Sequence, residues 1–265
     1  MLLWTRWARV STWSFAALLF VAIYGLPVAM IALASVSGQW NGILPSHLTL
    51  SHYTRILHSE SLDQLRVSVT TGAVASAAAL VAGTWSALAL RQFKGTPSRI
   101  LNVVFFLPSA VPSVSIGLGL LVAFSQRPLL LNGTATIVFV AHFLLISAFT
   151  YGNVSAGLAR FAPEYGEVAE SLGARPLYKL TRVTLPLVAP YLLAAFSLSF
   201  ALSMGELGAT LMIYPPGWVT LPVGIFALSD RGAIFDAATL TMVLGGGTLL
   251  VLLALSRVSS RAAVR

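Results

Sequence analysis

Only a few side chains in this sequence could do chemistry inside its long apolar stretches. Glu206 is the one carboxylate within such a stretch, and an ionisable group in lipid is costly unless it faces the interior of a helix bundle or water. Ser203, three residues before Glu206, and Thr210, four residues after it, are near Glu206 at helical spacing. We interpret Ser203, Glu206 and Thr210 as lining a path for a polar solute. The alternative is a structural hydrogen bond near the membrane interface.

The histidines are weaker candidates. His142 lies within another apolar stretch, where a hydrogen bond between helices is favoured over a proton relay. His47, His52 and His58 are five and six residues apart, which is not the one-face spacing of a helical metal site, so we expect them on a solvated surface. The sequence therefore predicts no metal site.

The motifs of catalysis and nucleotide binding are absent. The chain has no cysteine, no H-E-x-x-H, no G-x-S-x-G and no G-x-x-x-x-G-K-[ST] phosphate loop. We therefore expect no catalytic residue, no cofactor and no ATP hydrolysis by this chain.

Composition determines which elements must position these side chains. Of the 265 residues, 57% are hydrophobic and 9% are charged, whereas globular domains have about 25% charged residues. Apolar runs of about 20 residues recur along the chain, and in lipid such runs satisfy their backbone polar groups as helices. The sequence predicts an all-α polytopic membrane protein with about six spans: 13–33, 67–90, 100–124, 136–156, 187–211 and 235–255.

Two of these spans carry signals of helix geometry. Pro108 and Pro112 each remove a helical hydrogen bond, so a kink or a broken helix is expected in the third span. The second span has small residues at four-residue spacing, which permit close packing against another helix: Ala75, Ala79, Gly83 and Ala87.

The basic residues indicate the orientation. With six spans, 12 of the 16 fall on the side of both termini: Arg6, Arg9, Arg91, Lys94, Arg99, Arg160, Arg175, Lys179, Arg182, Arg257, Arg261 and Arg265. The positive-inside rule then predicts that both termini are cytoplasmic, so the net charge of +8 reflects orientation and not nucleic-acid binding. The first apolar run is longer than the 7–15 residues of a signal peptide, which favours a retained helix over cleavage.

The predicted cytoplasmic connection over 160–186 is the most informative segment. Pro163 can open a helix, Gly173 suits a left-handed cap, and a second helix can follow before Pro186 admits the fifth span. The first helix has three carboxylates at three-residue spacing, and the second has three basic residues: Glu164, Glu167 and Glu170, then Arg175, Lys179 and Arg182. A solvated hairpin is one interpretation, and transmission of force into the two adjoining spans is the other.

This segment resembles the coupling loop of binding-protein-dependent ABC importer permeases. The family pattern is Glu-Ala-Ala, three residues, Gly, nine residues, Ile, one residue, Leu-Pro. Here Glu167-Val168-Ala169, Gly173 and Val183-Thr184-Leu185-Pro186 match its spacing, with valine replacing one alanine and the isoleucine.

The resemblance implies a type I, MetI-like permease fold and a set of partners. It assigns Glu164, Glu167, Ala169, Gly173, Leu185 and Pro186 to coupling with an ATPase. The implied partners are a cytoplasmic ABC ATPase dimer, a second permease that is identical or related, a periplasmic solute-binding protein and membrane lipid. The implied location is the cell inner membrane. Residues 1–60 would form the first helix and an outer loop, and 61–265 the permease core.

Further stretches are similar to the iron(III), thiamine and phosphonate branch of this family, and most similar to permeases for 2-aminoethylphosphonate. They are 39–45, 106–112, 205–210 and 214–222. The resemblance implies import of 2-aminoethylphosphonate or a related phosphonate. Iron(III), thiamine, a polyamine or a sulfate-like solute remain alternatives, and an ion-coupled secondary transporter is a further one.

Overall fold

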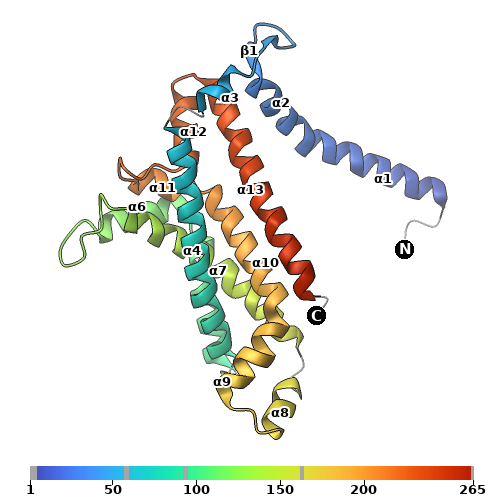
Figure 1. Cartoon of the computed structure of the whole chain (residues 1–265), viewed down its shortest axis with the longest axis vertical. Helices are drawn as coiled ribbons and strands as arrows, with labels where there is room; N and C mark the ends of the chain where they lie inside the picture. The colour runs from blue at the N-terminus through green and yellow to red at the C-terminus, as the bar shows by residue number, and fades with distance from the viewer. Residues whose placement is uncertain (1–4, 57–59, 92, 94, 162–163, 264–265) are drawn as a thin grey trace. The chain divides into compact units, whose positions relative to one another are not determined.

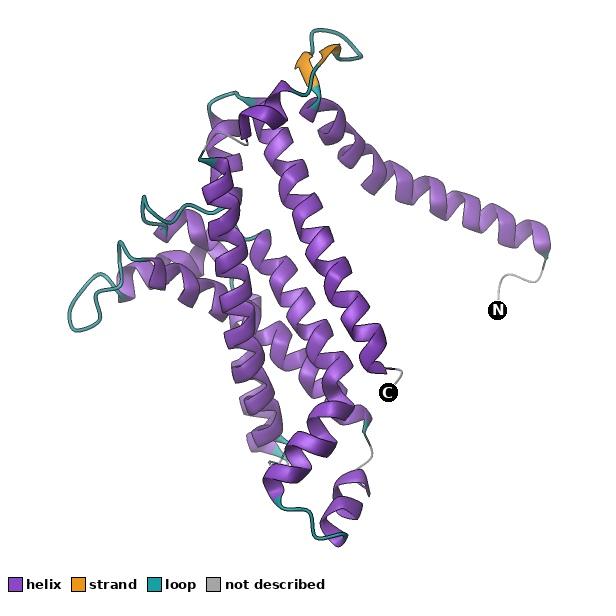
Figure 2. Cartoon of the chain, in the orientation of Figure 1, coloured by secondary structure: helices purple, strands orange, loops and turns teal. Residues whose placement is uncertain are grey.

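The chain is almost entirely helical in the computed structural model, which describes all residues except 1–4, 57–59, 92, 94, 162–163 and 264–265 (Figure 1, Figure 2). The helices are α1 (Arg6–Phe20), α2 (Leu26–Ser35), α3 (Ser51–Ile56), α4 (Ser61–Leu90), α5 (Thr96–Ala110), α6 (Ser113–Ala123), α7 (Ala135–Arg160), α8 (Glu164–Ser171), α9 (Pro176–Lys179), α10 (Leu185–Met204), α11 (Gly208–Ile213), α12 (Leu221–Asp230) and α13 (Ile234–Ala263). Strands β1 (Ser37–Gln39) and β2 (Ser46–Leu48) form an antiparallel hairpin.

Five helical segments among the described residues are long and apolar enough to cross a membrane. They are Arg6–Ser35, Ser61–Leu90, Ala135–Arg160, Pro176–Met204 and Ile234–Arg257. The pair α5 and α6 is a sixth candidate if it is counted as one broken span. The all-α polytopic architecture with about six spans is therefore confirmed, whereas the cytoplasmic placement of both termini stays a prediction.

The contacts divide the chain into two units. The first comprises residues 1–62 and 224–245, and the second comprises 63–223 and 246–265. The functional division into 1–60 and 61–265 stays a prediction.

In the first unit, a buried histidine corrects one expectation. His52 is 6% exposed, with Nδ1 2.7 Å from a carboxylate oxygen of Asp236 and Nε2 3.1 Å from the carbonyl oxygen of Ser37. Arg55 also lies 3.3 Å from the Asp236 carboxylate. These polar partners offset the free-energy cost of burying the imidazole ring. The prediction that His52 lies on a solvated surface is therefore wrong. His47 is exposed, as expected, and His58 lies outside the described residues.

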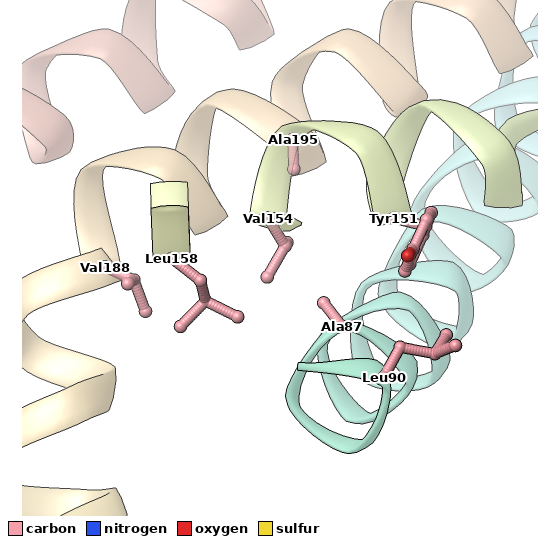
Figure 3. Close-up of a cluster of buried hydrophobic side chains, with 7 residues drawn as sticks. All are labelled: Ala87, Leu90, Tyr151, Val154, Leu158, Val188 and Ala195. Carbon is pink, nitrogen blue, oxygen red and sulfur yellow. The ribbon is translucent and has the colours of Figure 1, made fainter. Parts of the chain in front are cut away.

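In the second unit, α7 packs against both α4 and α10. A cluster of buried side chains joins the three helices: Ala87 and Leu90 of α4, Tyr151, Val154 and Leu158 of α7, and Val188 and Ala195 of α10 (Figure 3). The small residues of α4 lie at this contact. A Cβ on Gly83 would come within 3.0 Å of the backbone nitrogen of Tyr151, so the predicted close packing of this ladder is confirmed.

The third span is broken, as the two prolines predict. Helix α5 ends at Ala110, α6 begins at Ser113, and the two are bent by 99°. Val111 is extended, with φ −94° and ψ 134°, which is the conformation that Pro112 imposes on the residue before it.

The fifth span differs from the expectation of one helix over 187–211. Its helix begins earlier, at Pro176, and a π-helical turn at Leu180–Thr184 joins α9 to α10. Such a turn is a usual accommodation for a proline inside a helix, so Pro186 does not start a new helix. The helix ends at Met204, and a short second helix, α11, begins at Gly208. Glu206 therefore lies in a break between helices.

Candidate coupling loop and intramembrane pocket

The segment 160–186 has the predicted helix and glycine hinge. Helix α8 is capped by Gly173, whose φ is +79°. The N–H of Gly173 donates to the carbonyl of Glu170 at 2.9 Å, and the N–H of Ala174 donates to the carbonyl of Ala169 at 3.0 Å. These two bonds satisfy the last carbonyls of α8, as a left-handed cap does. Pro163 lies outside the described residues.

The two helices of this loop are linked by an ion pair. Nζ of Lys179, on the helix that begins at Pro176, donates to a carboxylate oxygen of Glu170 on α8. Glu164 and Glu167 lie exposed on α8. The predicted acidic and basic helices therefore face each other, but through one pair of side chains.

Helix α8 buries none of its residues. Large apolar side chains are exposed on α8, on the turn after it and on α9: Tyr165 and Val168, then Leu172, then Leu177 and Tyr178. An amphipathic segment that leaves such side chains uncovered has the character of a protein-binding surface. Ala169 and Leu185 are half-buried, and Pro186 is exposed.

The break in the fifth span is organised by Glu206. Helix α10 ends at Met204 with Gly205 as its cap, and a carboxylate oxygen of Glu206 accepts the N–H of Ala209 at 2.6 Å. A carboxylate that accepts a backbone N–H at the first turn of a helix stabilises that end. Glu206 therefore has the structural hydrogen bond that was the alternative to a pathway role.

Ser203 and Thr210, on either side of the break, both contact His142 of α7. Nδ1 of His142 lies 2.6 Å from Oγ of Ser203, and Nε2 lies 2.9 Å from Oγ1 of Thr210. All three side chains are buried. The predicted hydrogen bond between helices at His142 is confirmed, and its partners are two residues that the sequence had suggested for the path.

A pocket of about 220 Å³ lies at this junction. Its polar lining comes from Ser109, Ser113, His142, Ser203 and Glu206. Ser203 and Glu206 both line this pocket, whereas Thr210 does not, and the role of these three residues in a solute path stays a prediction. Sequence reasoning missed Ser109 and Ser113. The signal that could have found them is their position beside Pro108 and Pro112, where the third span breaks.

His142 is predicted to stabilise the packing of α7 against the broken helix. We expect His142→Leu to lower the free energy of unfolding by about 1–3 kcal/mol, because two buried hydroxyl groups lose their partner. Thermal unfolding in detergent, followed by size-exclusion chromatography, measures the change. The control is Ser147→Ala on the same helix, because the hydroxyl of Ser147 donates to the carbonyl of Leu144 within its own helix and, among the described residues, bonds no other helix. An unchanged melting temperature for His142→Leu would contradict the prediction.

No group of three or more histidine, cysteine, aspartate or glutamate side chains that could hold a metal ion occurs in the part of the chain that the structure describes.

Comparison with known sequences assigns most of the chain to one protein family. Residues 79–265 match the model of the binding-protein-dependent transport system inner membrane component. A Salmonella typhimurium (strain LT2) protein described as a 2-aminoethylphosphonate transport system permease protein, PhnV, is 55% identical over 261 residues, covering 98% of both chains. The putrescine transport system permease protein PotI of Escherichia coli K12 is 26% identical, covering 89% of this chain and 86% of PotI.

Solved structures agree on the fold. A chain of a bacterial ABC transporter that imports the polysaccharide alginate superimposes with a TM-score of 0.76 at 17% identity, covering 96% of both chains. The alginate transporter bound to its periplasmic protein superimposes with a TM-score of 0.77, covering 96% of this chain and 94% of the other. The broken spans and the helical loop before α10 therefore lie in an ABC importer permease fold. The chain belongs to the family of binding-protein-dependent transport system inner membrane components, and it is a multi-pass permease component of a membrane transporter.

Proposed function

We propose that this permease imports 2-aminoethylphosphonate or a closely related phosphonate across the inner membrane, in an importer driven by ATP. The observation that carries the proposal is the 55% identity to the relative described as a 2-aminoethylphosphonate permease, which extends over 98% of both chains. The residues at the two helix breaks, 106–112 and 205–210, lie within that match.

Energy for transport would come from partners. No phosphate-loop motif occurs in the sequence, so ATP hydrolysis is assigned to a cytoplasmic ABC ATPase dimer. A second permease, identical or related, would complete the path, and a periplasmic solute-binding protein would deliver the solute. The exposed apolar side chains of α8 suit docking of this helix into the ATPase, with Glu164, Glu167, Ala169, Gly173, Leu185 and Pro186 in the coupling segment.

The continuity of the fifth span suggests how the loop could act on the pocket. The helix from Pro176 to Met204 has 29 residues, which at 1.5 Å per residue is about 43 Å. One end is held to α8 by the pair of Lys179 and Glu170, and the other end borders the break at Glu206. Movement of α8 would therefore reach the pocket through one helix, without an intervening hinge loop.

In this proposal the pocket at Glu206 is part of the translocation path. Its carboxylate would attract the ammonium group of 2-aminoethylphosphonate. The hydroxyl groups of Ser109, Ser113 and Ser203 would donate to the phosphonate oxygens after giving up their present partners, which are the carbonyl of Phe106, the carboxylate of Glu206 and Nδ1 of His142. Thr210 would act indirectly, by fixing His142.

Uptake assays test which solute this permease transports. A strain that lacks its own phosphonate uptake should accumulate radiolabelled 2-aminoethylphosphonate only when it expresses this chain with its ATPase and binding protein. Unlabelled iron(III), thiamine, putrescine and sulfate serve as competitors, since the 26% identity to PotI makes a polyamine the second candidate. Accumulation of radiolabelled putrescine by the same strain, without accumulation of 2-aminoethylphosphonate, would replace the proposed solute by a polyamine.

Glu206→Gln should separate the pathway role from the structural one. The amide oxygen of glutamine can still accept the N–H of Ala209, so the melting temperature should stay near that of the native chain. Loss of the charge facing an ammonium group should lower uptake about tenfold. The control is Asp230→Asn, a carboxylate that is exposed at the end of α12. Unchanged uptake by Glu206→Gln at all solute concentrations would exclude the pathway role and leave Glu206 as a helix cap.

A further inference from the structure

A second cavity lies where the coupling loop meets the ends of the spans. It has a volume of about 590 Å³, within the range of small-molecule sites. Its walls come from the end of α4, the end of α7, helix α8 and the helix that begins at Pro176. We refer to it as the loop cavity. It is separate from the pocket at Glu206, because the two share no lining residue.

The loop cavity has an apolar wall on the side of the spans. This wall is formed by Leu88, Leu158, Phe161, Val183, Leu187 and Val188. Trp85 also lines the cavity and is 72% exposed. Tryptophan at the end of a membrane helix is typical of the interface where lipid headgroups lie. The loop cavity therefore lies at headgroup depth, with apolar surface toward the acyl chains.

The charged residues around the loop cavity balance one another. Four line it, and two of these, Lys179 and Glu170, pair with each other. The other two are Arg91 and Glu167, and neither has an ion-pair partner within the described part of the chain. One free guanidinium and one free carboxylate on the same cavity match a ligand that has one anionic and one cationic group.

We infer that the loop cavity binds a phospholipid with an ethanolamine headgroup. Arg91 binds the phosphate, Glu167 accepts hydrogen bonds from the primary ammonium, and an acyl chain lies along the wall of Leu88, Leu158 and Val188. Basic pockets between membrane helices bind the phosphate groups of anionic lipids, and here the added carboxylate of Glu167 favours a headgroup that also has an ammonium group. A free zwitterion of the size of 2-aminoethylphosphonate lacks the apolar part that this wall would cover, so the lipid is favoured over the soluble solute.

Native mass spectrometry of the purified full-length chain tests this inference without reference to transport. The chain is mixed with equal amounts of dioleoyl phosphatidylethanolamine, phosphatidylcholine and phosphatidylglycerol. We expect about tenfold preferential retention of phosphatidylethanolamine, because phosphatidylcholine has no ammonium hydrogen to donate and phosphatidylglycerol has no cation. Equal retention of the three lipids would overturn the inference.

Matched variants locate the site. Arg91→Gln should reduce retention of phosphatidylethanolamine about tenfold, and Arg91→Lys should restore most of it, which guards against a folding defect. Glu167→Gln should abolish the preference over phosphatidylglycerol. Arg99→Gln, an exposed arginine of α5 that does not line the loop cavity, should change nothing. Retention that is unaffected by Arg91→Gln would place the lipid elsewhere.

A competition arm distinguishes the lipid from the soluble zwitterion. A large excess of free 2-aminoethylphosphonate should leave bound phosphatidylethanolamine in place. Displacement of phosphatidylethanolamine from the native chain by the free solute would overturn the assignment to lipid and make the loop cavity a site for the soluble solute. Neither result depends on uptake, so failure of this inference and failure of the proposed solute are distinguishable.

Discussion

Replacing Gly173 by valine is expected to reduce ATP-driven uptake at least tenfold. Gly173 has a φ of +79°, a conformation that costs an L-residue about 1–2 kcal/mol and costs a β-branched residue more. The N–H of Gly173 must also keep its hydrogen bond to the carbonyl of Glu170, which caps α8. Valine would therefore shift the loop away from the conformation that presents α8, and each 1.4 kcal/mol weakens docking tenfold.

Gly173→Asn is the matched control, because asparagine tolerates a positive φ far better than valine. No other part of the described chain lies within 4 Å of a Cβ at this position, so the Cβ that both substitutions add meets no packed neighbour there. Co-purification with the ATPase and uptake by membrane vesicles measure the effect. Native binding and uptake in Gly173→Val would show that the loop is not the coupling element.

Gly117→Ala is expected to lower the free energy of unfolding by about 1–3 kcal/mol, the usual cost of forcing one extra carbon into a packed contact. Helices α6 and α11 meet at this glycine. A Cβ at Gly117 would lie 2.6 Å from the carbonyl oxygen and 2.8 Å from the Cα of Ala209. These are backbone atoms, so the contact cannot relax by rotation of a side chain.

Gly119→Ala provides the control two residues away on the same helix. No other part of the described chain comes within 4 Å of a Cβ on Gly119, so alanine there should be neutral or slightly stabilising. Helix α6 contributes Ser113 to the pocket at Glu206. Because Gly117→Ala displaces α6, we expect the variant also to take up less solute than the native chain. Melting temperature and uptake are measured for both variants. Equal values for the two would contradict the close packing of α6 on α11.

The sequence was sufficient for the features that depend on local chemistry. Apolar runs predicted the membrane helices, Pro108 and Pro112 predicted the break in the third span, and Gly173 predicted the cap of α8. Each of these depends on a few neighbouring residues, whose preferences are strong and are not overridden by packing.

The features that the sequence did not predict depend on distant partners or on short interruptions. The break at Glu206 is only three residues long, too short to alter a hydropathy window of about 19 residues. Burial of His52 requires Asp236, which is 184 residues away in the chain. The pocket combines Ser109 and Ser113 with Ser203, and this juxtaposition requires that α6 packs on α11 and that α7 packs on α10.

Uptake into proteoliposomes tests the central claim most directly. They would contain this chain, its second permease and its ATPase, with ATP enclosed and the binding protein outside. We predict that 2-aminoethylphosphonate accumulates only with ATP and the ATPase present, that an uncoupler has no effect, and that Gly173→Val lowers accumulation at least tenfold. Accumulation driven by a proton gradient in the absence of the ATPase would contradict the account and identify an ion-coupled secondary transporter.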